Sequence, residues 1–283
     1  MDVWKFHDVT FTWLDGGLCY LDGGAMFGVV PKALWSRKYP EVENNTIPLR
    51  TDPILVEVGG KYALIDAGVG YNKWPDKTKR NLGIQSESRV EQSLGELGLT
   101  PEQIDMIWMT HMHHDHASGL TKRDGDGWTS IYPNADIYVS QTEWDELRNP
   151  NIRSRNAYWR ENWEPLVSQV KTFDKTCTVA PGVTMEHTGG HSDGHAVIRI
   201  DREGETVIHM ADIMPTHAHQ NPLWVLAYDD YPMTSIYAKQ RYMEEALNNQ
   251  YRFIFYHDAI YRMVQFSEDG RSITESLEST APR

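Results

Sequence analysis

Cysteine, long apolar runs and linker-like segments are scarce or missing in this sequence, and each absence excludes a class of protein. Only Cys19 and Cys177 occur, so neither a disulfide framework nor a cysteine zinc site is expected. No run of about 18 apolar residues is present, so no membrane-spanning helix is expected, and no signal-peptide pattern is visible. Because repeats and Gly/Ser/Pro-rich linkers are also missing, we expect one domain over residues 1–283 in the cytoplasm.

Positive charge is also scarce. The chain has 27 Lys and Arg against 40 Asp and Glu, a formal net charge of −13 at pH 7. Such a surface repels phosphate backbones and anionic lipids, so neither nucleic acid nor a membrane is expected as a partner. Aromatic residues are plentiful, with ten Trp, and these side chains build cores and line apolar pockets.

Short apolar runs alternate with amphipathic stretches, which favours an α/β fold. Gly59 and Gly60 separate runs at 54–58 and 62–65, a pattern typical of a β-hairpin. Further strands are predicted at residues 104–109, 136–139, 196–200, 206–210 and 252–256.

Helices are predicted between these strands. Ser88 and Glu91 have the spacing of a capping box before a helix, and Thr100–Gln103 predicts a short helical turn that starts with Pro. The longest predicted helix covers residues 232–248, with its apolar face formed by Met233, Ile236, Tyr237, Met243 and Leu247.

The segment from about residue 16 to 51 shows little periodicity. A structureless stretch of this length is uncommon inside a compact domain. We interpret it as an N-terminal arm that packs over the body and over the active site. A simple surface excursion is the alternative.

The motif His111-x-His113-x-Asp115-His116 follows directly after an apolar run that ends at Met109. In a chain with twelve His, such a pattern would arise by chance on the order of once in a thousand cases. A solvated polar loop would not explain its position after a buried strand. Imidazole and carboxylate ligands together suit zinc and related divalent metals.

Three more candidate ligands follow apolar runs further along the chain: His191, Asp212 and His257. Strand ends that deliver polar side chains to one sheet edge are typical of a site. Each residue alone could be a hydrogen-bonded core His or a capping Asp. Together with the motif, the set favours a metal centre.

The order of these seven candidate ligands along the chain resembles the ligand order of the metallo-β-lactamase superfamily. This resemblance implies an αβ/βα sandwich of two mixed sheets flanked by helices. The resemblance implies two metal ions, with Asp212 bridging them together with a hydroxide, and it gives Asp115 and Asp212 the catalytic roles. It assigns His111, His113 and His191 to the first metal and Asp115, His116 and His257 to the second. It also implies that Asp66 supports the site from behind the ligands, while His114 occupies the variable position and is not expected to be a ligand.

Within this superfamily, four segments resemble quorum-quenching N-acyl-homoserine lactone lactonases of the YtnP type: residues 23–32, 110–119, 187–195 and 210–219. This resemblance implies opening of a lactone ring by attack of the metal-bridging hydroxide, with a small-molecule lactone as the partner. A homodimer is left open. An apolar channel for the acyl tail is expected, with Met26, Phe27 and Trp224 as candidate substrate-binding residues and packing in the core as the alternative for each.

One position departs from the lactonase pattern. Some lactonases of this type have a Tyr three residues after the bridging Asp, and Pro215 stands there in this chain. The alternatives are therefore a phosphotriester hydrolase of the methyl-parathion-hydrolase type, or a promiscuous lactonase or esterase. A non-catalytic metal-binding scaffold is the hypothesis from another class.

Overall fold

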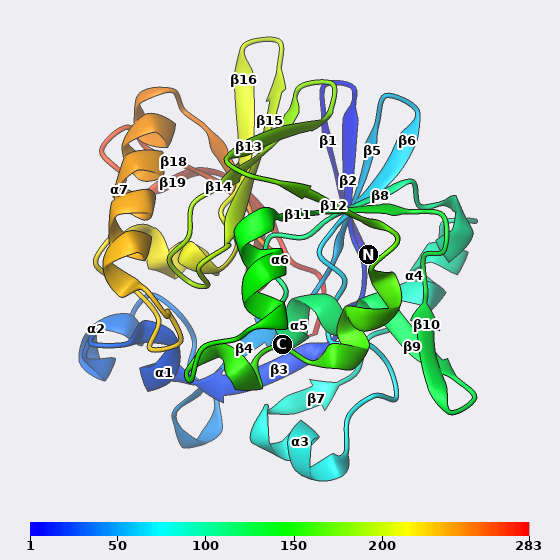
Figure 1. Ribbon diagram of the computed structural model, residues 1–283. Coiled ribbons are helices and arrows are strands. Elements are labelled where there is room, and N and C mark those ends of the chain that lie inside the picture. Colours follow the sequence, from blue (N-terminus) through cyan, green and yellow to red (C-terminus); the bar gives the residue numbers. More distant parts are fainter. Residues whose placement is uncertain (283) are drawn as a thin grey trace.

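Residues 1–282 are described by a computed structural model, in which two seven-stranded sheets face each other (Figure 1). In the first sheet the strand order is β1 (Asp2–Phe6), β2 (Val9–Trp13), β5 (Ile54–Val58), β6 (Lys61–Ile65), β8 (Met106–Trp108), β11 (Asp136–Ser140) and β12 (Val170–Phe173). The pairs of β1 with β2, β2 with β5 and β5 with β6 are antiparallel. The pairs from β6 to β12 are parallel, so the sheet is mixed.

The second sheet is mixed too. Its order is β13 (Thr176–Ala180), β14 (Val183–His187), β15 (Ala196–Arg202), β16 (Glu205–His209), β17 (Arg252–Ile254), β18 (Tyr261–Phe266) and β19 (Ile273–Glu278). Only β16 and β17 pair in parallel, and helix α7 (Pro232–Asn248) joins these two strands. A parallel pair requires such a crossover connection.

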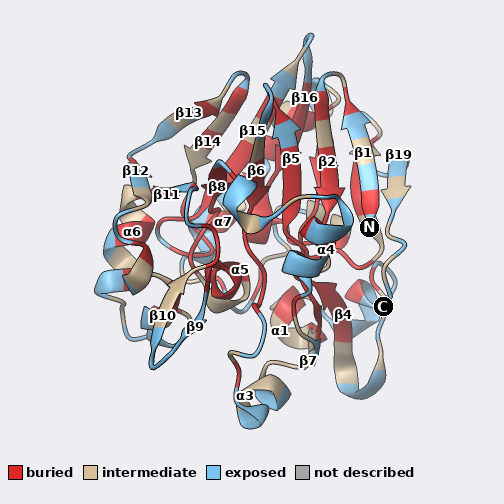
Figure 2. Cartoon of the chain, turned by 90° about the vertical axis from the view of Figure 1, so that its right-hand side faces the viewer, coloured by how far each residue is buried: buried red, intermediate tan, exposed pale blue. Residues whose placement is uncertain are grey.

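The main core fills the space between the sheets, as the buried strand centres in Figure 2 show. Alternate residues such as Val9, Phe11 and Trp13 on β2 point into it and meet Ile198 and Ile200 from β15. Helices α4 (Val90–Glu96) and α6 (Gln141–Arg148) cover the outer face of the first sheet, and α7 covers that of the second. The αβ/βα sandwich is therefore confirmed.

Two local predictions about helices are wrong. Helix α4 begins after Arg89, and the Ser88 hydroxyl accepts only the nearby N–H of Val90 at 3.3 Å, so the predicted capping box is absent. Helix α7 has the predicted bounds, but Met233 and Tyr237 are exposed. The buried ammonium of Lys239 donates to the carbonyl of Trp224, and this polar anchor turns a different face inward.

The arm contains regular structure, so the expectation of a structureless segment is wrong. It forms β3 (Leu18–Asp22), α1 (Gly23–Phe27), α2 (Lys32–Trp35) and β4 (Thr46–Arg50). With β7 (Ile84–Ser86) it builds a three-stranded sheet in the order β4-β3-β7, below the two large sheets in Figure 1. Short-range apolar periodicity misses this unit because its core comes from residues far apart in the sequence, such as Phe27 and Leu226.

The remaining α-helices and strands are short: α3 (Asp76–Asn81), α5 (His114–Ala117), β9 (Thr121–Asp124) and β10 (Gly127–Ser130). Strands β8 and β17 are shorter than predicted because the chain leaves each strand to enter a loop that carries candidate ligands. No helix within residues 1–282 is long and apolar enough to cross a membrane.

Candidate metal centre

Four strand ends deliver the candidate ligands to one place. Three groups of three residues bring their ligand atoms within 4.8 Å of one another. The groups are His111, His113 and His191; His111, His116 and Asp212; and Asp115, His116 and His257. All seven residues named from the sequence therefore belong to these groups.

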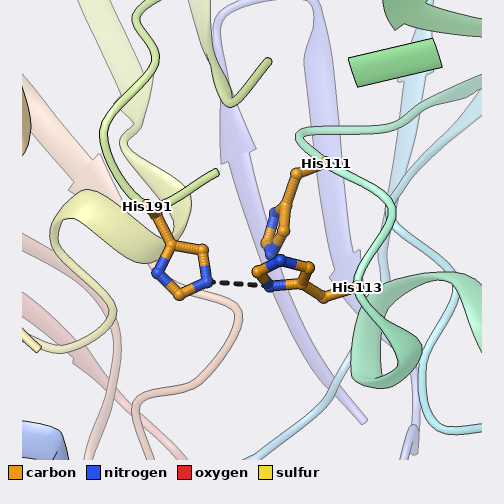
Figure 3. Close-up of side chains that lie close together, drawn as sticks. All are labelled: His111, His113 and His191. Atoms are coloured by element: carbon orange, nitrogen blue, oxygen red, sulfur yellow. Dashed lines mark hydrogen bonds between the residues drawn. The ribbon is translucent and has the colours of Figure 1, made fainter. Parts of the chain in front are cut away.

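In the first group the imidazole rings point toward a common centre (Figure 3). Nε2 of His191 lies 3.0 Å from Nδ1 of His113. Two neutral imidazoles at this distance can share only one proton. The far nitrogens are already engaged, since Nδ1 of His191 donates to Asp229 Oδ1 at 2.9 Å and Nδ1 of His111 donates to Thr110 Oγ1 at 3.0 Å. Each of these two rings is thereby held with the lone pair of Nε2 facing the centre.

The group of Asp115, His116 and His257 has the same construction. Nε2 of His116 lies 3.1 Å from Nε2 of His257. Their far nitrogens donate to Asp66 Oδ2 at 2.8 Å and to the carbonyl of Arg50 at 2.7 Å. Oδ2 of Asp115 lies 3.7 Å from the His257 nitrogen, so a carboxylate completes this group.

Asp212 lies between the two groups. Its Oδ2 is 3.3 Å from Nε2 of His191, and its Oδ1 is 3.3 Å from Nε2 of His257 and 3.5 Å from Nε2 of His116. One carboxylate thus presents one oxygen to each group. Its position is fixed by the preceding Ala211, which has the unfavourable φ of 44°, and by its own N–H, which donates to His195 Nε2 at 3.2 Å.

The charges in the cluster favour a bound cation. Burial and the neighbouring imidazoles hold the pKa of His111 and His113 well below the usual value. Burial alone would raise the pKa of Asp115, but the imidazoles of His116, His114 and His257 lower it to about 2. Metal ligands must be neutral imidazoles and ionised carboxylates, and these two imidazoles and this carboxylate are in those states at neutral pH. Although burial lowers it, the pKa of His116 and His191 is raised by Asp212 and other neighbouring carboxylates, so a cation must displace a proton from these two imidazoles.

The residues present fit metal ions on a second ground. Nε2 of His111 and Oδ1 of Asp212 are buried, yet neither has a hydrogen-bond partner within residues 1–282. Buried polar atoms without partners are costly and require an explanation. Two aligned lone pairs in a cluster of imidazoles and carboxylates are best explained as ligands of a divalent cation.

Asp66 supports the ligand loop, in the position expected from the sequence. It accepts the N–H of Thr110 at 2.8 Å and the Nδ1 proton of His116 at 2.8 Å. Its φ of 55° is costly for a residue other than glycine. Strain of this kind is stored where the surrounding contacts fix the backbone.

Sequence reasoning missed two carboxylates that organise the site. Asp229 orients His191, and it lies in a loop without periodicity, so only the Asp229-Asp230 doublet marked it. Glu143 on α6 accepts the N–H of Met112 at 2.7 Å and the hydroxyl of Ser192 at 2.6 Å. It therefore ties the motif loop to the loop of His191, and burial raises its pKa to about 7.

A cavity of about 490 Å³ opens onto the cluster. Its walls come from the arm, from the segment 69–84, and from the loops 153–157 and 226–230. The apolar part of the lining consists of Leu21, Met26, Leu49, Val69, Trp74, Leu82, Ile84, Ala157, Leu226 and Ala227. The arm therefore does pack over the site.

Of the three candidate substrate-binding residues, only Met26 lines this cavity. Phe27 is fully buried, with its ring stacked between Trp35 at 5.1 Å and His219 at 4.4 Å. Trp224 packs its edge on Phe27 at 5.9 Å. The prediction that Phe27 and Trp224 line the substrate pocket is wrong, since both belong to the core of the arm.

Three histidines outside the ligand groups contact other residues, and of these His114 also lines the cavity. His114 lies outside the three groups, and its ring packs edge-on against Trp74 at 5.4 Å. His217 pairs with Asp258 at 2.6 Å, and His219 donates to the carbonyl of Met26 at 2.8 Å. Neither His217 nor His219 lines the cavity.

Comparison with known proteins agrees with this geometry. Residues 46–247 match the family model of the metallo-beta-lactamase superfamily, and the chain belongs to this superfamily. A probable metal-dependent hydrolase from Staphylococcus aureus, known from its crystal structure, is 45% identical; the alignment covers 99% of this chain and all of that one, with a TM-score of 0.94.

More distant relatives include lactonases. The N-acyl homoserine lactonase AiiA from Bacillus thuringiensis subsp. kurstaki is 26% identical over 151 residues, which is 53% of this chain and 54% of that protein. The match thus spans about half the length of this relative. The structure of AidC, a dizinc quorum-quenching lactonase in complex with a product, covers 98% of its chain and all of this one at 16% identity and a TM-score of 0.79, which shows a shared fold.

Proposed function

We propose that this protein opens the ring of N-acyl-homoserine lactones, using two divalent metal ions, zinc in the first instance. The observation that carries the proposal is the Asp212 carboxylate, whose two oxygens each lie 3.3 Å from an imidazole of a different ligand group. The partly apolar cavity beside it suits an acyl chain. The names of the lactonase relatives support the same substrate class.

The residues that would hold the first ion are His111, His113 and His191, and those for the second are Asp115, His116 and His257, with Asp212 shared. When bound, such a pair of ions lowers the pKa of water to roughly 7 and so supplies hydroxide at neutral pH. Asp66 and Asp229 keep the imidazoles of His116 and His191 in the orientation that this requires.

The cavity binds and orients the substrate. Met26, Leu21 and Leu49 form an apolar wall supplied by the arm, and each methylene fully buried there contributes about 0.8 kcal/mol. Two further buried methylenes therefore favour a longer acyl chain by about tenfold, since about 1.4 kcal/mol corresponds to one decade.

A turnover screen tests the proposal. The zinc-loaded protein is assayed on N-acyl-homoserine lactones of different chain length, on simple lactones and on methyl paraoxon, with Asp212→Asn as the blank. We expect the highest kcat/KM on the acyl-homoserine lactones. If kcat/KM for methyl paraoxon exceeded kcat/KM for every lactone by several decades, the lactonase assignment would be refuted. The proposal of a two-metal hydrolase would still stand.

Phosphotriester hydrolysis is the second candidate, and Pro215 is the observation that favours it. A proline has no proton to donate at the position where related lactonases have Tyr. Aryl phosphotriesters have good leaving groups and need no such donor. A promiscuous lactonase or esterase would show comparable turnover on all three substrate sets. The homodimer and the cytoplasmic location stay predictions.

A further inference from the structure

The loop 226–230 is held rigidly against the metal centre. On one side the N–H of Ala227 donates to the carbonyl of Ala25 in the arm at 2.8 Å. On the other side Asp229 Oδ1 accepts from His191 Nδ1 at 2.9 Å, and the N–H of Asp230 donates to the carbonyl of His191 at 3.0 Å. Tyr228 is the residue between these anchors.

Arg153 adds a third anchor from the facing loop. Its Nε donates to Asp230 Oδ1 at 2.7 Å, and its Nη2 donates to the carbonyl of Asp229 at 3.0 Å and to that of Ala227. These contacts fix the backbone on both sides of Tyr228 relative to His191.

Tyr228 lines the cavity together with Asp115, His191 and Asp212. Its side chain is 44% exposed, and within residues 1–282 no protein group accepts a hydrogen bond from its hydroxyl. Burial and then the carboxylates of Asp22 and Asp115 raise the pKa of this phenol. The hydroxyl thus keeps its proton at neutral pH and is a free donor on a residue that lines the cavity.

Two other polar groups of the lining are already engaged. The hydroxyl of Thr51 donates to the carbonyl of Gly16 at 2.8 Å, and the guanidinium of Arg153 is occupied as described. Pro215 has no donor. Asn81, His114, Ser154 and Asn156 also line the cavity. Tyr228 is the tyrosine of this lining, and it lies on a different segment of the chain from Pro215.

We propose that Tyr228 is a catalytic residue that donates the proton to the leaving alkoxide when the lactone ring opens. This inference rests on the proposed function. Hydroxide adds to the carbonyl carbon, the ring C–O bond breaks, and the alkoxide oxygen takes the phenolic proton of Tyr228. The phenolate then regains a proton from the new carboxylic acid, which leaves a hydroxyl and a carboxylate as the products.

The first test uses Tyr228→Phe and two esters that share the hexanoyl group. N-hexanoyl-homoserine lactone has an alkoxide leaving group that requires a proton, whereas 4-nitrophenyl hexanoate does not. We expect kcat for the lactone to fall about 100-fold, the usual size of a general-acid contribution, while kcat for the aryl ester changes less than about twofold. An equal fall on both esters would show a merely structural role and overturn the inference.

The second test measures binding and needs no turnover. Calorimetry compares the ring-opened product N-hexanoyl-homoserine with N-hexanoyl-2-aminobutyrate, which lacks the hydroxyl. We expect the unsubstituted protein to bind the hydroxyl compound several-fold more tightly, as one hydrogen bond allows, and Tyr228→Phe to bind both equally. The same several-fold preference in Tyr228→Phe would overturn the inference.

The matched control is Tyr231→Phe, because Tyr231 is similarly exposed at 39% and lies three residues away but does not line the cavity. It should behave as the unsubstituted protein in both tests, and both variants should keep their metal content. If the unsubstituted protein opens lactones and Tyr228→Phe opens them equally fast, only this inference fails. If the unsubstituted protein opens none, the proposed function fails with it.

Discussion

The ligand cluster and the arm wall meet in the same cavity but are held by different forces. In the cluster, four imidazoles donate from the far nitrogen to a fixed acceptor, for example His116 to Asp66 and His257 to the carbonyl of Arg50. In the arm wall, the backbone of Leu21 and Leu49 lies on the paired strands β3 and β4, but the side chains of Leu21, Met26 and Leu49 make apolar contacts. Hydrogen bonds are directional and apolar contacts are not, so the cluster fixes the chemistry and the wall can change to select substrates.

The largest expected effect comes from the residue shared by both ligand groups. Asp212→Asn should abolish hydrolysis and lower the metal content from about two ions per chain, because a neutral amide replaces the carboxylate between two cations. Elemental analysis and turnover of the same preparation measure both. Asp201→Asn on strand β15 is the matched control and should keep both. Full metal content and activity in Asp212→Asn would contradict the shared role.

The carboxylates behind the ligands should show smaller and selective effects. Asp66→Ala and Asp229→Ala each remove the acceptor of one imidazole, so each should weaken metal affinity by about 10–100-fold. A two-site zinc titration should assign the loss to the group of His116 in the first variant and to the group of His191 in the second. The same loss at both sites in both variants would mean that the groups are not independent.

The arm wall should change selectivity and leave the metals in place. Met26→Ala should reduce the preference for an acyl chain two methylenes longer, by up to about tenfold, because those methylenes lose their apolar contact. Specificity constants on a series of chain lengths measure this. Phe27→Ala should instead lower the free energy of unfolding by about 3–5 kcal/mol, since Phe27 lies in the core of the arm. An unchanged chain-length profile in Met26→Ala would place the acyl chain elsewhere.

The smallest effect is expected inside the motif itself. His114→Ala should leave the metal content unchanged, because His114 belongs to none of the ligand groups and packs against Trp74. Elemental analysis beside His113→Ala, which removes a member of the first group, provides the comparison. Loss of an ion from His114→Ala would mean that the motif is read in the wrong register.

Local patterns predicted the elements that have local causes. The hairpin of β5 and β6 is confirmed because two glycines with φ of 58° and 73° form its turn. The bounds of α7 are confirmed for a similar reason, since Pro232 starts it. The prediction of which face of α7 is buried was wrong. Lys239 points inward and donates a hydrogen bond to the carbonyl of Trp224, which lies outside the helix, and the helical periodicity of α7 does not record this contact.

The sequence by itself determined which residues belong together at the metal centre, because an uninterrupted motif and three strand ends carry ligand types that need one another. Only the tertiary structure decided what surrounds them. Asp229, Glu143 and Tyr228 reach the site from loops and a helix without any periodic signal, and Phe27 turned inward although it lies next to Met26. Such positions depend on contacts between segments far apart in the chain, and no local pattern of residues records those contacts.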